Sequence, residues 1–202
     1  DITFHSMDMI LRPSESFQWR WDNIGKYHGS FQEDTPPRYT NGKFSFEPDM
    51  SDDHFLDYLA GQQDIDLSLK RNYPNLHLLP DTSDGHIILK VESPYVIVGG
   101  TLQAEFMRPS ADDAINVFVS TTNGQWESIS SPVQTGVFKS TISLDQWIAP
   151  WSSKAKYLSY LMIEFIPSGV DSHVGMNYFS LDTDVQISPF ALPSLMIGEY
   201  EI

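Results

Sequence analysis

The sequence predicts an all-β fold, a two-sheet antiparallel β-sandwich of jelly-roll type with one short helix. From residue 85 onward, short apolar runs alternate with polar residues, and Gly, Pro, Asn and Asp separate the runs. This period-two alternation is typical of half-buried strands. The 202 residues are 41% hydrophobic, which is enough to bury a substantial core. We therefore expect one domain over residues 1–202, with residues 1–80 as an irregular N-terminal elaboration.

Alternation in the N-terminal part predicts strands over residues 7–13 and 15–21. The second of these places Phe17, Trp19 and Trp21 on one face. The Asn41-Gly42 pair predicts a tight turn. Residues 51–60 form the one predicted helix, which begins after an N-cap at residue 51 and ends at Gly61.

The remaining elements are strands with apolar positions on alternate residues. The predicted core positions are Ile88, Val96, Val98, Val117, Val119, Leu161, Ile163, Phe165 and Phe179. Asn123-Gly124 predicts a two-residue hairpin turn. Because Pro189 and Pro193 cannot donate to a central ladder, we expect the chain to leave the sheet at Ser188 and to return as a strand near 195–202.

The net charge is −15 and the isoelectric point is about 4.5. So acidic a chain argues against nucleic acid and anionic membranes as partners, and is compatible with bound cations. The absence of cysteine excludes disulfides and thiolate catalysis. No apolar run approaches the ~20 residues that span a bilayer. The chain begins without Met, so we expect a mature product or a piece of a larger polypeptide, located extracellularly or at the cell surface.

No catalytic residue is predicted. The G-x-S-x-G elbow is absent, and the six histidines are scattered without a paired acid. The 27 acidic residues include many pairs that could serve glycoside hydrolysis, but an acidic surface is the simpler explanation. Whether the chain is an enzyme stays open, with non-catalytic the favoured answer.

Asp182 and Asp184 alternate along one strand, so both carboxylates can face the same side. Two like charges repel unless a cation separates them. Structural calcium, which prefers oxygen ligands, is the metal expected there. The alternative is two solvated carboxylates at a sheet rim.

Aromatic and cationic residues alternate between positions 19 and 39, and carbohydrates stack on Trp and Tyr rings. The predicted ligand-binding residues are Trp19, Arg20, Trp21, Lys26, Tyr27, His28, Arg38 and Tyr39, together with Trp151 from a later loop. The patch would suit a uronic acid or a sulfated sugar, and Arg20 or Arg38 would bind the carboxylate of the uronic acid. The alternative is that these rings pack inward. It is favoured for the two strand tryptophans and stays open for the loop rings.

Several stretches resemble the β-sandwich ancillary regions of large secreted bacterial polysaccharide-active proteins. They are SPYVIVGGTLQAEF, VFVSTTNGQWESI, NYFSLDTDVQISPFALPSL and RPSESFQWRWDNIGKYHG. The hairpin departs from a sialidase-type Asp box because Asn123 replaces the Asp, so a sialidase propeller is not expected.

The resemblance implies a non-catalytic carbohydrate-binding or ancillary module of a glycan-processing protein. An acidic polysaccharide would be its ligand, and the other domains of a lyase or hydrolase its neighbours. The competing class is a structural or interaction module, such as a surface-layer, adhesin or fibre subunit.

Overall fold

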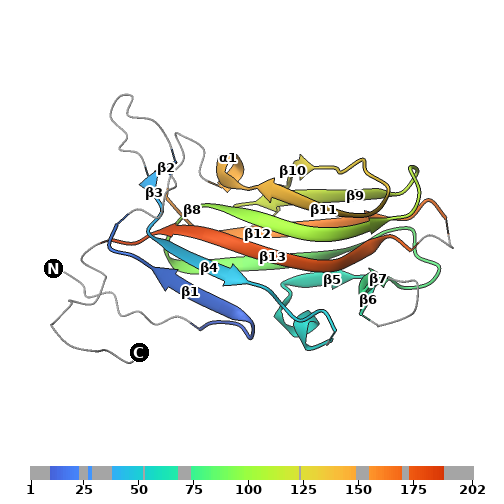
Figure 1. Cartoon of the computed structure of the whole chain (residues 1–202), viewed down its shortest axis with the longest axis horizontal. Helices are drawn as coiled ribbons and strands as arrows, with labels where there is room; N and C mark the ends of the chain where they lie inside the picture. Colours follow the sequence, from blue (N-terminus) through green and yellow to red (C-terminus); the bar gives the residue numbers. More distant parts are fainter. Residues whose placement is uncertain are drawn as a thin grey trace.

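Strands account for most of the computed structural model, which describes residues 10–22, 27–28, 38–51, 53–67, 74–122, 124–148, 155–169 and 173–188. The strands are β1 (Glu15–Trp19), β2 (Tyr27–His28), β3 (Arg38–Tyr39), β4 (Gly42–Phe46), β5 (Gly61–Gln63), β6 (Ile65–Leu67), β7 (Leu76–Leu78), β8 (Gly85–Arg108), β9 (Ala114–Ser120), β10 (Glu127–Ser130), β11 (Gly136–Ser143), β12 (Lys156–Ile166) and β13 (Gly175–Gln186). Two short helices, η1 (Asp53–Tyr58) and α1 (Asp145–Ile148), complete the described part (Figure 1). The predicted all-β class is confirmed.

The 24-residue strand β8 organises both layers of the sandwich. Its first half pairs with β12 and β5, and its second half pairs with β13 and β11. One layer therefore has the order β5-β8-β12-β9-β10, and the other has the order β1-β4-β13-β8-β11. β1 and β4 come from the N-terminal 80 residues and are full members of the second layer.

A large bulge marks the point where β8 passes from one layer to the other. Glu92 pairs with Leu158 and Ile97 pairs with Lys156, so residues 93–96 lie opposite the single residue Tyr157. Pro94 within this bulge has no N–H to give to a ladder. Val96 already pairs with Gln186 of β13. Bulges of this kind bend a strand and redirect its side chains.

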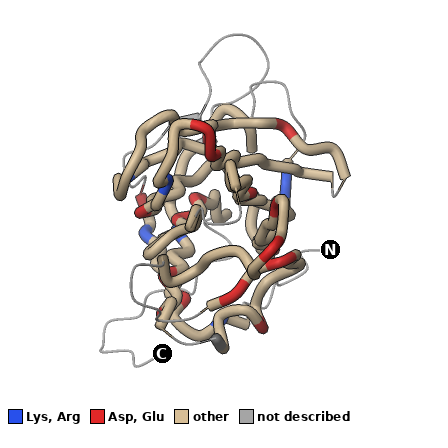
Figure 2. The backbone as a smooth tube through the Cα atoms, turned by 90° about the vertical axis from the view of Figure 1, so that its right-hand side faces the viewer, with Lys and Arg blue, Asp and Glu red and all other residues tan. Residues whose placement is uncertain are grey.

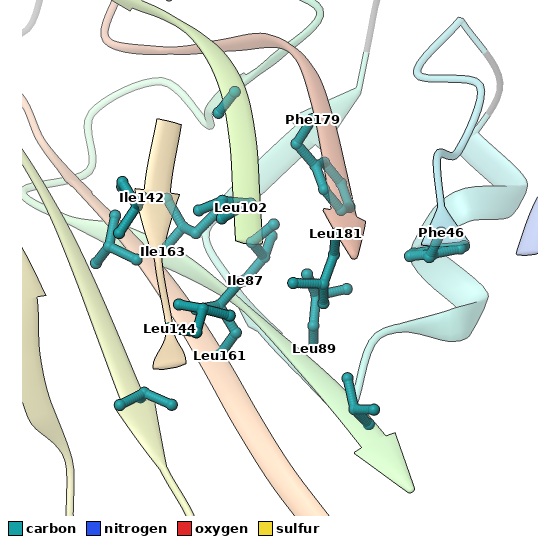
Figure 3. Close-up of a cluster of buried hydrophobic side chains, with 14 of the residues drawn as sticks. Phe46, Ile87, Leu89, Leu102, Ile142, Leu144, Leu161, Ile163, Phe179 and Leu181 are labelled. Atoms are coloured by element: carbon teal, nitrogen blue, oxygen red, sulfur yellow. The ribbon is translucent and has the colours of Figure 1, made fainter. Parts of the chain in front are cut away.

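The core lies between the two layers (Figure 3). Ile87 and Leu89 from the first half of β8 are fully buried, as is Leu102 from the second half. Among the predicted core positions, burial is confirmed for Val98, Val117, Val119, Leu161, Ile163, Phe165 and Phe179. It is wrong for Ile88 and Val96, which are half-buried. The run of three apolar residues at 87–89 hid the phase of the strand. Val96 keeps the phase of Ile88, because odd-numbered residues stay buried through Ile97 and even-numbered ones are buried only from Val98 onward.

Three local predictions need correction or refinement. The helix expected over residues 51–60 is the shorter 3-10 helix η1. Asn41-Gly42 is not a turn. Asn41 is buried, its amide donates to the Ile187 carbonyl (3.0 Å), its Oδ1 accepts from Ile187 N–H (2.7 Å), and Gly42 opens β4. The β9–β10 hairpin forms as expected, but its connection spans residues 121–126 rather than two residues.

The C-terminal prediction is tested only in part. β13 ends at Gln186, so the described chain leaves the ladder just before Ser188. The expected final strand near residues 195–202 lies outside the described residues.

Candidate functional site

A surface groove of about 510 Å³ lies along the edge strand β1. The described residues that line it are Phe17, Gln18, Trp19, Arg20 and Lys43. They supply two aromatic rings, one amide and two cations. The chain has 12 basic and 27 acidic residues, and Figure 2 shows Asp and Glu at many places along the described backbone, so two cations in one groove stand out from an acidic background. We call it the cationic groove.

The rings of the cationic groove rest on the core. Phe17 and Trp19 are half-buried and stack with centroids 5.8 Å apart. Phe17 also contacts Phe44 (4.5 Å) and stacks on Tyr95 (5.7 Å). Trp19 pairs across the strands with Gly42, so no cross-strand side chain covers the indole. A side chain at position 42 would clash, since its Cβ would lie 2.6 Å from Ile187 Cδ1.

The polar groups of the groove come from the opposite face of β1 and from β4. Gln18 pairs with Lys43 in the antiparallel ladder, and both Gln18 and Arg20 are exposed. The backbone N–H of Arg20 donates to the Asn41 carbonyl (2.7 Å), which fixes the chain where β1 ends. The Lys43 ammonium donates to Asp182 Oδ2 (3.0 Å). Hence Lys43 is held in place, whereas Arg20 extends into solvent.

Four of the predicted ligand-binding residues lie in one small hairpin, β2–β3. Tyr27 pairs with Tyr39 and His28 pairs with Arg38. Tyr39 is half-buried, and its N–H donates to Gln186 Oε1 (3.4 Å), which ties the hairpin to the end of β13. The side chains at positions 27, 28 and 38 lie outside the described residues.

Trp19 and Arg20 line the cationic groove, and Trp21, 46% exposed, follows directly after them. The expectation that Trp19 packs inward fits its half-buried position, whereas Trp21 points to solvent. Lys26 and Trp151 lie outside the described residues. The sequence analysis did not identify Lys43 as a site residue. Lys43 enters the groove because it lies opposite Gln18 in the β1–β4 ladder.

The two carboxylates expected to hold calcium differ in their surroundings. Asp182 accepts hydrogen bonds from Lys43 Nζ (3.0 Å) and Ser45 Oγ (2.6 Å). Asp184 is buried, with 1% of its surface exposed. Within the described ranges, no group of three or more His, Cys, Asp or Glu side chains could hold a metal ion. Lys43 already neutralises Asp182. Calcium at Asp182 and Asp184 stays a prediction.

Comparison with known proteins finds structural neighbours but no sequence family. No family model and no curated protein matches the chain. Similar solved structures include a CBM35 module from Cellvibrio japonicus Abf62, at 10% identity and a TM-score of 0.38, with 64% of this chain and 94% of that chain covered. A CBM35 module in complex with a disaccharide containing glucuronic acid gives 9% identity, a TM-score of 0.39 and coverage of 64% and 94%. The xylan-binding module CBM15 gives 9% identity and a TM-score of 0.39, with 70% of this chain and 95% of that chain covered.

These neighbours are carbohydrate-binding modules, the class of region that the sequence motifs resemble. At TM-scores below 0.4 the function of this chain has to be argued from its own residues. In the part of the chain that is described, no helix is long and apolar enough to cross a membrane.

Proposed function

We propose that this chain is a non-catalytic carbohydrate-binding module that holds an acidic polysaccharide in the cationic groove. The observation that carries the proposal is the groove lining, in which Trp19 and Phe17 stand beside Arg20 and Lys43. Aromatic rings stack on the apolar faces of sugars, and a guanidinium binds a carboxylate through two parallel hydrogen bonds. Uronic acids offer an apolar sugar face and a carboxylate, and sulfated sugars offer a sulfate in place of the carboxylate.

The setting that we propose is a secreted glycan-processing protein, with the module at the cell surface or outside the cell. Other domains of the same chain would carry the chemistry. The net charge of −15 opposes a polyanionic ligand over most of the surface and so restricts where it can bind. A polyanion meets repulsion over most of the acidic molecule, so binding should concentrate at the local cationic groove.

Isothermal titration with polygalacturonate fragments and with a neutral cello-oligosaccharide tests the proposal. We expect micromolar to millimolar binding of the acidic ligand, since a few stacked rings and charged hydrogen bonds give no more. Trp21→Ala and Arg20→Gln should each weaken it without a loss of folded protein, because both side chains are exposed. Lys139→Gln is the matched control, since Lys139 is an exposed cation on β11. Equal loss in Arg20→Gln and Lys139→Gln would contradict a specific site.

One observation favours the structural or interaction module as a second candidate. β11 is an edge strand that pairs only with β8 among the described strands, and Val137 on it is 59% exposed. Val133, just before the strand, is 80% exposed. Unpaired edges with apolar side chains can recruit another chain. Light scattering of the wild type and of Val137→Lys distinguishes the candidates, because only an assembly module loses a self-associated form.

A further inference from the structure

A second groove of about 710 Å³ lies beside the first, between the start of β1, η1 and the bulge of β8. Its apolar lining includes Tyr58, Leu59 and Pro94. Tyr58 is 37% exposed, so one flat ring faces the groove. We call it the η1 groove.

The charges of the η1 groove are paired. Arg12 Nη2 donates to Glu15 Oε1 (2.7 Å) and Arg12 Nε donates to Glu15 Oε2 (3.2 Å), so the pair is bidentate. The guanidinium also lies 3.9 Å above the Phe46 ring. Lys90 donates to Glu92 at the opposite wall. The Arg12–Glu15 pair is fixed before any ligand arrives, which lowers the entropic cost of binding, whereas the Lys90–Glu92 pair is exposed to solvent.

The balance of charge differs from that of the cationic groove. Among the described residues that line the η1 groove, Arg12 and Lys90 face three acids, Glu15, Asp57 and Glu92. A second carboxylate would meet net negative charge there. Hydroxyl groups, which donate and accept at once, suit paired ions and a Tyr ring better. The η1 groove therefore favours an uncharged sugar.

The two grooves adjoin at β1 without sharing a lining residue, and a ligand that occupies both would pass around the edge of that strand, because Gln18 and Arg20 lie on its opposite face. Glu15, which lines the η1 groove, lies on the same face of the strand as Phe17 and Trp19, which line the cationic groove. Phe44 of one groove contacts Phe17 of the other. At about 3.3 Å per residue, the strand advances about 17 Å from Glu15 to Arg20. This distance exceeds one sugar ring, so a single ligand would have to be an oligosaccharide to reach both ends.

The bulge of β8 places a buried hydroxyl next to this junction. Tyr95 follows Pro94 of the η1 groove and stacks on Phe17 of the cationic groove at 5.7 Å and 12°. It is only 7% exposed, and its hydroxyl has no hydrogen-bond partner. An unsatisfied buried hydroxyl is costly, and this one belongs to the core beneath the junction rather than to the lining of either groove.

We propose that the two grooves form one extended site for a polysaccharide that carries uncharged sugars beside acidic ones. The acidic residue lies against Arg20 and Lys43, and an uncharged residue stacks on Tyr58. This inference rests on the proposed function, and it adds the length and the mixed composition of the ligand. Tyr58 is then a specificity-determining residue that short acidic ligands do not reach.

Titrations with glucuronic acid-substituted xylo-oligosaccharides, from the disaccharide to the hexasaccharide, test the inference. The affinity should rise with length. Tyr58→Ala should weaken hexasaccharide binding about fivefold to tenfold, as expected for one lost stacking contact, and leave disaccharide binding unchanged. Arg20→Gln should weaken both. Tyr157→Ala, which removes an exposed ring outside both grooves, is the control.

An affinity that does not change with ligand length, or hexasaccharide binding that is unchanged in Tyr58→Ala, would overturn the inference. The proposed function would still stand in that case if Arg20→Gln weakened binding. Absence of binding by the wild type to every acidic probe would overturn both. Circular dichroism of Tyr58→Ala excludes unfolding as the cause of a loss.

Discussion

The cationic groove and the η1 groove share a wall of aromatic rings but present their charges in opposite ways. At the first, Arg20 extends into solvent at the end of β1. At the second, the side chains of Arg12 and Glu15 are only 17% and 8% exposed and bind one another. A paired, desolvated ion mainly supports the fold, whereas an exposed cation beside a ring remains available to a ligand. The number of cations in a groove is therefore a poorer guide to its ligand than the partners they already have.

Phe17→Ala should have the largest effect on stability, because Phe17 lines the cationic groove and packs against Phe44, which lines the η1 groove. It contacts Trp19, Phe44 and Tyr95. We expect a loss of about 3 kcal/mol in the free energy of unfolding, at the low end for Phe→Ala because the side chain is only half-buried. Urea denaturation measures it, with Val137→Ala as an exposed control near zero. A cost below 1 kcal/mol would mean that the grooves do not share a structural wall.

Arg12→Met sharpens the comparison of the two arginines. It leaves the mostly buried Glu15 carboxylate without its partner and removes the cation above Phe46. We expect a destabilisation of about 2 kcal/mol, whereas Arg20→Met should change stability by less than about 0.5 kcal/mol. Thermal and urea unfolding of both variants give the answer. If the two substitutions cost the same, the distinction between paired and available cations is wrong.

Chelation tests the calcium prediction at Asp182 and Asp184. An ion that binds only the folded state stabilises it by mass action, so EDTA should lower the melting temperature by a few degrees, which corresponds to about 1 kcal/mol. Asp182→Asn should abolish this difference. If EDTA leaves the melting temperature of the wild type unchanged, Lys43 and Ser45 suffice to satisfy Asp182 and the ion is not needed.

Tyr95→Phe should change stability at neutral pH by about as much as chelation, but in the stabilising direction. Removal of a hydroxyl that has no partner should raise stability by about 1 kcal/mol. Burial raises the pKa of Tyr95 above its ordinary value of 10.0, so the folded state holds the proton more tightly than the unfolded state. That preference adds nothing below about pH 10 and costs stability as the pH rises through 10 and the unfolded chain ionises.

Urea unfolding of wild type and Tyr95→Phe at pH 7 and pH 10.5 tests both parts. The variant should lose less stability than the wild type between the two pH values. A Tyr95→Phe protein that is less stable at pH 7 would show that the hydroxyl is satisfied in the folded state.

The alternation of apolar residues was enough to predict the fold class and most of the core, since period two is visible wherever a strand has one polar face. The phase was assigned wrongly at Ile88, inside a run of three apolar residues, and at Val96, because the buried positions of β8 change from odd to even numbers only after residue 97, beyond the bulge at residues 93–96. The Ser93-Pro94 pair was the available signal for that bulge.

For the candidate site, the density of rings and cations between residues 19 and 39 pointed to the end of β1, where Trp19 and Arg20 line the cationic groove, and their part in binding stays a prediction. Lys43 could not be found without the β1–β4 register, because it lies 23 residues beyond Arg20 in the chain. The η1 groove combines residues from β1, η1 and β8, and no local pattern connects segments so far apart in sequence.

The central claim is that an exposed cation, Arg20, beside rings at the end of β1 binds an acidic polysaccharide. Affinity electrophoresis through gels that contain polygalacturonate, at 20 mM and 500 mM NaCl, tests it most directly for the wild type, Arg20→Gln and Lys139→Gln. We predict that the wild type and Lys139→Gln are retarded at low salt, that Arg20→Gln migrates freely, and that salt abolishes the retardation by screening the exposed charges. Free migration of the wild type at low salt would contradict the account.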